Sequence, residues 1–129
     1  MRASEVPGTA LILFAHGARD PEWVEPIRRV RATLAARAPE VRVELAFLEF
    51  IAPNLRDCAE FLVAGGVERI LVLPMFIARG GHLKRDIPRL IEDLRARHPQ
   101  VSFELAPAIG EVESVIQAMA SYALALATR

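Results

Sequence analysis

Four short apolar runs alternate along this chain with longer segments of helical periodicity, and no other feature restricts its fold as strongly. The first run, Thr9–Ala15, is too short for a typical helix and is bounded by Pro7-Gly8 and by Gly17. A continuous apolar run of this length is typical of a strand buried on both faces. The sequence predicts further strands at 41–47, 69–74 and 101–105.

The segments between these runs repeat their apolar residues every three or four positions, as helices do. The first predicted helix, 21–37, follows Asp20, which can cap a helix whose first residue is proline. The others are predicted at 55–64, 84–97 and 112–127. The alternation predicts one α/β domain over 1–129, with a four-stranded parallel sheet and helices on both faces. Because crossovers are right-handed, few topologies remain, and we favour the flavodoxin-like strand order 2-1-3-4.

The last predicted helix carries almost no charge after Glu113. The residues expected to face inward are Val112, Val115, Ile116, Met119 and Ala123. The residues that extend its apolar surface beyond one stripe are Tyr122, Leu124 and Leu126. Two interpretations stay open, namely a well-buried helix and a contact between subunits.

The composition excludes several classes of protein. A chain of 129 residues, 53% of them hydrophobic, fits one ordinary domain whose core needs no disulfide. The 16 basic and 16 acidic residues balance and form no basic block, so we expect no nucleic-acid partner. The single cysteine, Cys58, excludes an internal disulfide and a cysteine-ligated iron–sulfur cluster within one chain.

The sequence also predicts a cytoplasmic protein that uses no nucleotide. Residues 1–8 lack the apolar stretch of a signal peptide, and no run of about 18 apolar residues occurs, so we expect no membrane span. No G-x-G-x-x-G follows the first strand, and G-x-x-x-x-G-K-[ST] occurs nowhere. We therefore expect no phosphate-binding loop.

Polar residues follow three of the predicted strands where each strand ends. His16 follows the first strand, Glu49 the second, and His82 lies in the loop 76–83 after the third. Ligands of open parallel sheets bind at this carboxyl edge, and strands one and three are neighbours in the favoured order. Two imidazoles and one carboxylate suit divalent cobalt, nickel, iron or zinc and leave coordination positions open, which indicates chemistry rather than a structural site.

Each of these residues also has an ordinary interpretation when taken alone. A histidine after a strand is often a loop or capping residue, and Gly80-Gly81 could simply form a turn. His98, beside Pro99 at a helix end, is interpreted as a cap or surface residue. The basic residues that flank the same edge are Arg19, Arg79, Lys84 and Arg85. They form either a solvated rim or a surface that attracts a polycarboxylate substrate.

Three stretches together resemble a known family. FAHGARDPEW (14–23), AFLEF followed by Pro53, and RILVLPMFIARGGHLKRDIP (69–88) are similar to the small sirohydrochlorin chelatases of the short CbiX type. The motifs run from about residue 11 to residue 88, and the similarity in length and pattern continues to the C-terminus. HG-x-R-D-P-x-W and GGH-x-x-x-D-I-P in this order and spacing are hard to match by chance.

The resemblance implies roles for particular residues. His16 and His82 would hold the metal, and Glu49 would lie near the metal and the macrocycle. The loop implied to contact the tetrapyrrole consists of Ile77, Ala78, Arg79, Gly80 and Gly81. The implied pigment, sirohydrochlorin, carries eight carboxylates, which would explain a basic rim that includes Arg19. The resemblance also implies a homodimer of chains about half as long as two-domain chelatases, without the iron–sulfur cluster of longer relatives.

Metal insertion requires that two pyrrole N–H protons leave the ring. We expect His16 or Glu49 to accept them, with His16 favoured because a histidine can take up a proton near neutral pH. Cobalt, leading to cobalamin, is the favoured metal, and iron, leading to sirohaem, and nickel are the alternatives. A carrier that binds metal or tetrapyrrole without turnover would need the same residues. A histidine phosphatase is disfavoured because its chemistry requires arginine where Ala15 stands.

Overall fold

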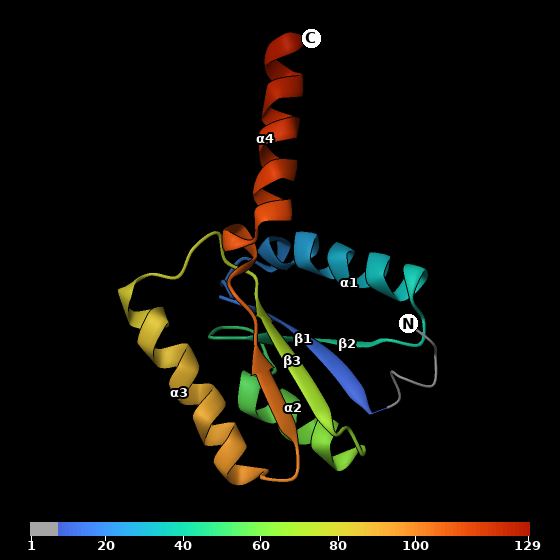
Figure 1. The fold of residues 1–129 in the computed structure, drawn as a ribbon, viewed down its shortest axis with the longest axis vertical. Coiled ribbons are helices and arrows are strands. Elements are labelled where there is room, and N and C mark those ends of the chain that lie inside the picture. Colours follow the sequence, from blue (N-terminus) through green and yellow to red (C-terminus); the bar gives the residue numbers. More distant parts are fainter. Residues whose placement is uncertain (1–7) are drawn as a thin grey trace.

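The computed structural model describes residues 8–129, which form one parallel sheet with helices around it (Figure 1). Residues 1–7 lie outside the described part of the chain. The expectations about a signal peptide and about the first residues of the domain fall on them. The strands are β1 (Thr9–Ala15), β2 (Arg42–Phe47), β3 (Arg69–Pro74) and β4 (Ser102–Leu105). Their order is β2-β1-β3-β4 with every pair parallel, so the predicted topology is confirmed.

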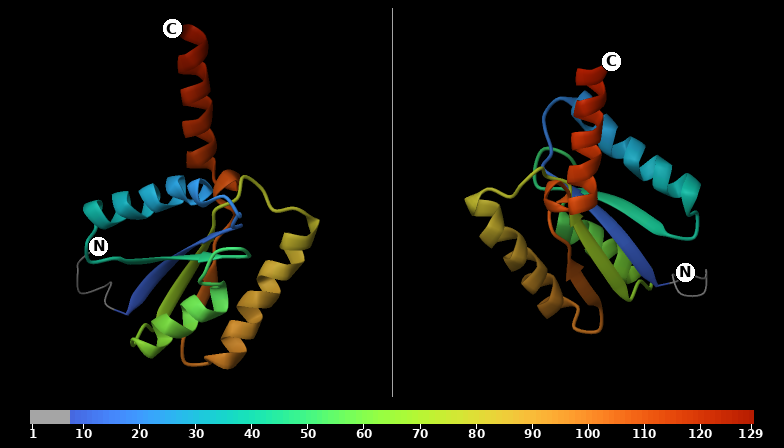
Figure 2. Two further views of the ribbon diagram at one scale, coloured as in Figure 1. Left: turned by 180° about the vertical axis from the view of Figure 1, so that it is seen from behind. Right: turned by 45° about the horizontal axis from the view of Figure 1, so that its top comes forward.

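Helices lie on both faces of the sheet, as predicted. The helices α2 (Leu55–Ala64) and α3 (Gly81–Arg97) cover one face and enclose the larger core, in which Ile12 and Ile87 are fully buried. The helix α1 (Glu25–Arg37) covers β2 and part of β1 on the opposite face (Figure 2). A smaller cluster that includes Val24 and Phe47 lies there.

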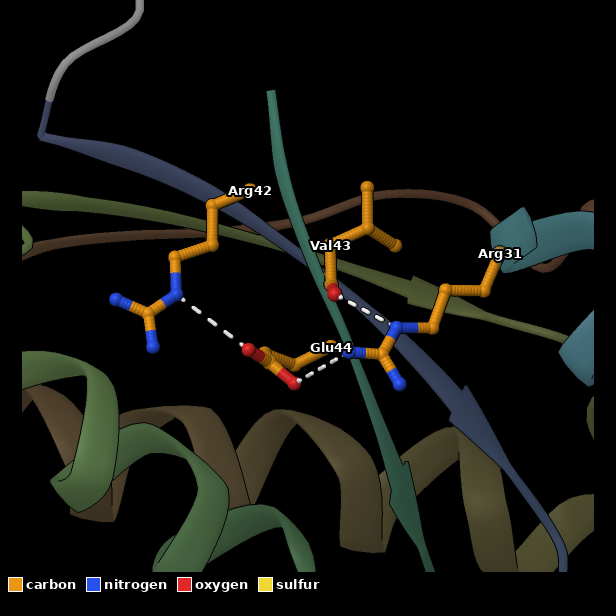
Figure 3. Close-up of polar contacts among 4 residues, drawn as sticks. All are labelled: Arg31, Arg42, Val43 and Glu44. Carbon is orange, nitrogen blue, oxygen red and sulfur yellow. Dashed lines mark hydrogen bonds and ion pairs between the residues drawn. The ribbon is translucent and has the colours of Figure 1, made fainter. Parts of the chain in front are cut away.

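The outer strand β2 is protected by charged side chains. Arg31 of α1 donates hydrogen bonds to the carbonyl of Val43 at 3.1 Å and to the carboxylate of Glu44 at 3.3 Å (Figure 3). Arg42 donates to the other carboxylate oxygen of Glu44 at 3.4 Å. The Arg31 contacts connect α1 to the sheet. Charged groups on an edge strand also discourage pairing with another chain, so they protect the exposed edge of β2.

Two helices begin elsewhere than predicted. The segment Pro21–Val24 forms the 3-10 helix η2, which Asp20 caps. The helix α1 starts only at Glu25, because Pro26 has no backbone N–H to donate to the preceding turn. The helix α3 begins at Gly81, three residues before the predicted start, since glycine's low helix propensity concealed its first turn. The predicted loop 76–83 is therefore shorter, and His82 belongs to a helix.

The prediction that the last helix packs inward is wrong for this chain. The helix α4 (Glu113–Thr128) projects away from the rest of the molecule, and none of its residues is buried (Figures 1 and 2). Val112 and Val115 are half-buried near the 3-10 helix η3 (Ile109–Glu111), whereas Ile116, Met119 and Ala123 are exposed. The apolar pattern indicates that a helix face should be covered, but it does not specify what covers it.

Within residues 8–129, no helix combines the length and the apolar character that crossing a membrane requires.

Candidate functional site

His16 and Glu49 form a pair at the carboxyl edge of the sheet. His16 directly follows β1, and Glu49 lies two residues beyond the neighbouring strand β2. The His16 Nε2 atom lies 3.1 Å from the Glu49 Oε1 atom, and about half of each side chain is exposed (52% for both). The two groups are thus close enough to act on one ligand while solvent and substrate can still reach them.

The backbone around Gly17 explains why this pair forms. The Glu49 N–H donates to the His16 carbonyl at 3.1 Å, so the two chain segments run in contact beyond the end of the sheet. Gly17 has a φ of +96°, and a Cβ atom at this position would lie 1.8 Å from the Glu49 carbonyl oxygen. Only glycine allows this approach, and the approach places both functional side chains on the same side.

Phe76, just after β3, borders the His16 ring. The two rings meet edge to face with their centroids 6.3 Å apart, and Phe76 is buried. The imidazole therefore has both an aromatic ring and a carboxylate as neighbours. This arrangement restricts the orientations of His16 while leaving its Glu49 side open to solvent.

His82 does not join this pair in the structure. It is the second residue of α3 and is exposed at the start of that helix. In the described part of the chain, no three histidine, cysteine, aspartate or glutamate side chains lie close enough together to hold a metal ion. The structure brings together two of the three expected donors and leaves His82 apart.

The loop before His82 is open to solvent. Ile77 is 70% exposed, and Ala78 is exposed as well. A Cβ atom on Gly80 or on Gly81 would meet nothing within 4 Å, so internal packing does not explain these glycines. Their small size leaves room for a ligand to approach the backbone.

The basic residues of the rim differ in their surroundings. Arg79 is half-buried and pairs with Glu111 of η3, with its Nε atom 3.4 Å from Oε1. Lys84 and Arg85 are exposed on the first turns of α3. The charge of Arg79 is therefore partly compensated within the protein, and Lys84 and Arg85 lie open to a ligand.

Phe50 is a candidate site residue that the sequence did not reveal. Its ring is 56% exposed, and its φ of 67° lies in the left-handed region that bulky residues rarely adopt. The Arg19 guanidinium carbon lies 4.7 Å from the centre of the ring. Its place beside Glu49 could have marked Phe50 as a site residue, but no pattern in the sequence predicts its backbone conformation. Strained, exposed residues of this kind concentrate at functional sites.

Two other residues lie apart from this pair. His98 is the C-cap residue of α3, as expected, and its ring contacts Phe103 with the ring centres 6.3 Å apart. Cys58 is buried on α2, where burial, with a smaller contribution from Glu44, raises the pKa of its thiol to about 11. A protonated, buried thiol is a poor metal ligand and a poor nucleophile.

Comparisons with known proteins give one family. The model of the CbiX family matches residues 10–124. A sirohydrochlorin cobaltochelatase of Sulfurisphaera tokodaii is 32% identical over 107 residues, which are 83% of this chain and 84% of that protein. A protein of the same name from Priestia megaterium is 30% identical over 84% of this chain, but this chain spans only 35% of its length.

Solved structures agree with this family. A CbiX protein of cobalamin biosynthesis from Marinobacter aquaeolei superposes with a TM-score of 0.78 at 30% identity, covering 89% of this chain and 93% of that one. The sirohydrochlorin chelatase SirB of Bacillus subtilis subspecies spizizenii, in complex with cobalt, gives a TM-score of 0.72 at 26% identity. That match covers 85% of this chain and 47% of SirB. SirB from Bacillus subtilis with Fe³⁺ gives a TM-score of 0.71 at 27% identity, over 44% of its length.

Proposed function

This chain belongs to the CbiX family, and we propose that it is a chelatase that inserts a divalent metal into sirohydrochlorin. The observation that carries the proposal is the pairing of His16 with Glu49 at the carboxyl edge of the sheet. Relatives named sirohydrochlorin cobaltochelatase support the choice of reaction.

The spacing of the pair suits two ligands of one metal ion, which is here a substrate. A metal about 2.1 Å from both donor atoms would hold them about 3.0 Å apart at a right angle and about 3.4 Å apart at the tetrahedral angle. The separation of 3.1 Å between Nε2 and Oε1 lies within this interval. His16 and Glu49 can therefore bind the ion with little movement and leave its other positions open to the pyrrole nitrogens.

His82 supplies a further metal ligand in this proposal. It is the second residue of α3 and follows Gly80 and Gly81, at which an added Cβ atom would meet nothing within 4 Å. The open space beside the two glycines leaves room for a small displacement of residues 80–82. Three protein ligands at most would hold the ion loosely enough for transfer to the ring, whereas a site in which protein ligands fill every coordination position would retain it.

The same pair handles the protons that leave the ring. When the metal passes to the macrocycle, the His16 imidazole is free to accept a pyrrole proton. The carboxylate of Glu49 at 3.1 Å then stabilises the imidazolium by a charge-assisted hydrogen bond. Glu49 can relay the first proton to solvent because half of its side chain is exposed, and His16 is then free to accept the second pyrrole proton.

The macrocycle rests on the exposed apolar residues around the pair. Phe50, which follows Glu49, and Ile77, which follows Phe76, present large apolar surfaces to solvent. The flat ring covers these side chains, and its carboxylates meet Arg19, Lys84 and Arg85. Arg79 contributes mainly by holding the loop 77–81 against Glu111.

Cobalt is the proposed metal, and iron and nickel are the alternatives. The names of the relatives and the SirB complex with cobalt support cobalt, and the SirB complex with Fe³⁺ supports iron as the second choice. We also propose that the chain acts as a homodimer in the cytoplasm. The uncovered helix α4 supports the dimer.

The decisive experiment is incubation of the protein with sirohydrochlorin and Co²⁺, Fe²⁺ or Ni²⁺ in turn, while the visible spectrum is recorded. Many turnovers per chain at low protein concentration support an enzyme, and at most one equivalent of product indicates a carrier. His16→Ala, Glu49→Ala and His82→Ala should each abolish the acceleration of metal insertion by the protein. His98→Ala is the matched histidine control and should retain it. Undiminished insertion by both His16→Ala and His82→Ala contradicts the proposal.

A further inference from the structure

The loop between β3 and α3 has few contacts within itself. In the described part of the chain, the backbone N–H groups of residues 77–79 donate no hydrogen bond to another backbone group. Ile77 is exposed, and an added Cβ atom on Gly80 or on Gly81 would meet nothing within 4 Å. Contacts with another element must therefore set the position of this loop, which leads directly to His82.

The 3-10 helix η3, near the base of α4, makes the first of these contacts with its backbone (Figure 1). The Gly110 N–H donates to the Phe76 carbonyl at 3.0 Å. A Cβ atom on Gly110 would lie 2.0 Å from the Ile77 carbonyl oxygen and 2.4 Å from the Ile77 Cα atom. Both are backbone atoms that cannot rotate out of the way, so only glycine allows η3 to lie this close to the start of the loop.

Glu111 makes the second contact with its side chain. Its Oε1 atom accepts a hydrogen bond from the Arg79 Nε–H at 3.4 Å, and the Arg79 side chain is only 22% exposed. Among the residues that the structure describes, Glu111 is the only hydrogen-bond acceptor that this guanidinium meets. Since solvent and salt screen a partly buried ion pair less than an exposed one, this pair can hold the middle of the loop.

The sheet in turn holds η3 in place. Ala108, the residue before η3, is fully buried in the core. The Ala106 N–H donates to the Val72 carbonyl at 2.9 Å, which continues the pairing of β4 with β3 beyond the last residue of β4. The two contacts therefore connect the loop to the best-ordered part of the molecule.

We propose that Gly110 and Glu111 are positioning residues of the metal site. They hold residues 77–79 against η3, so that only residues 80–82 move when His82 reaches the metal. The inference rests on the proposed function, in which His82 is a metal ligand. Without the two contacts the whole loop would have to be ordered when the metal binds, and the lost conformational entropy would weaken binding. Neither positioning residue is itself a ligand.

The first test is limited proteolysis with trypsin, which cleaves after arginine, on the folded protein without metal. Glu111→Ala should increase the rate of cleavage after Arg79 several-fold, as measured by mass spectrometry, because an unpaired Arg79 in a loosened loop enters the protease more readily. Glu104→Ala is the matched control. It breaks the 3.0 Å ion pair with Arg69, at the opposite end of β3 from the loop, and should leave cleavage after Arg79 unchanged.

Gly110→Ala removes the backbone contact and should have the same effect on cleavage after Arg79. Its control is Gly65→Ala, where an added Cβ atom would meet its nearest neighbour at an ordinary distance of 3.5 Å. Should Gly110→Ala fail to fold, Glu111→Ala still decides the test, because the Glu111 side chain is partly exposed and lies outside the core.

Calorimetric titration with Co²⁺ alone tests whether the two contacts act through His82. Glu111→Ala should lower the affinity for Co²⁺ several-fold in the wild-type background but cause no further loss in a His82→Ala background. Glu111→Gln loses the same charge but keeps an acceptor for Arg79, so it should retain most of the affinity. Equal losses with and without His82 overturn the inference, because Glu111 would then act by its charge or by general stability.

The two measurements separate a failure of this inference from a failure of the proposed function. A wild-type chain that binds Co²⁺ no more tightly than its His82→Ala variant contradicts the proposed role of His82, and the positioning role falls with it. A wild-type chain whose Co²⁺ affinity depends on His82, but whose affinity and cleavage after Arg79 are unchanged by Glu111→Ala, leaves the proposed function intact and overturns only the positioning role.

Discussion

Gly17 and Glu49 approach so closely that a Cβ atom on Gly17 would lie 1.8 Å from the Glu49 carbonyl oxygen. Gly17→Ala should therefore separate the two chain segments that hold His16 beside Glu49. The left-handed φ of +96° alone costs a side chain roughly 1–2 kcal/mol, and the backbone clash adds to that. We expect a loss of insertion activity together with a lower unfolding midpoint, measured by thermal denaturation.

Gly66→Ala is the matched control for this variant. Gly66 has nearly the same φ, +93°, but an added Cβ atom would meet nothing within 4 Å. Gly66→Ala should lower the free energy of unfolding by the conformational penalty alone and leave the rate of metal insertion unchanged. Equal effects of both substitutions on activity would argue that the Gly17–Glu49 contact has no part in the site.

Glu49→Gln should weaken metal binding without changing the shape of the site. The amide can still form a hydrogen bond with His16, but it has no negative charge to balance the ion or an imidazolium. We expect the affinity for Co²⁺ and the rate of insertion to fall by about 10-fold or more. Isothermal titration with Co²⁺ alone and the visible-spectrum assay would measure these two effects. The control is Glu92→Gln, which replaces an exposed carboxylate paired with Arg95 and should change neither the Co²⁺ affinity nor the insertion rate.

The sheet could be predicted from the sequence because its determinants are local. Apolar runs such as Thr9–Ala15 are too short for helices, and right-handed crossovers leave few strand orders. The approach of His16 to Glu49 followed from the rule that parallel strands end at one edge. The distance of 3.1 Å did not follow, because it depends on the backbone contact that Gly17 permits.

The position of α4 could not be predicted, because its apolar stripe would look the same against its own sheet or against another chain. The structure shows only that this stripe lies uncovered within one chain. The start of α3 was missed since Gly80 and Gly81 resemble a turn in sequence, although Lys84 already donates its N–H to the Gly80 carbonyl. The strained backbone of Phe50 likewise has no signature in the residues around it.

Phe50→Gly should weaken substrate binding without lowering the stability of the protein. Glycine removes the strain of a φ of 67°, which is worth roughly 1–2 kcal/mol, and adds an entropic cost of roughly 0.5–1 kcal/mol. Little burial is lost because the ring is 56% exposed. We expect unchanged or slightly higher stability in urea denaturation but a several-fold higher KM for sirohydrochlorin. Phe61→Ala removes another exposed ring next to an arginine, Arg42, and should leave KM unchanged.

The Cys58 thiol should stay unreactive in the folded protein and make folding sensitive to alkaline pH. Burial, assisted by Glu44, raises its pKa from 9.0 to about 11, so at pH 8 only about one thiol in 1000 is ionised. We expect a thiol reagent such as DTNB to react only after unfolding. Because the folded state holds this proton more tightly than the unfolded state, the contribution to stability is complete below pH 9 and is lost as the pH rises towards 11. In Cys58→Ala, urea denaturation at pH 8, 9 and 10 should show a smaller loss of stability than in the wild type, and parallel pH profiles would contradict the assignment.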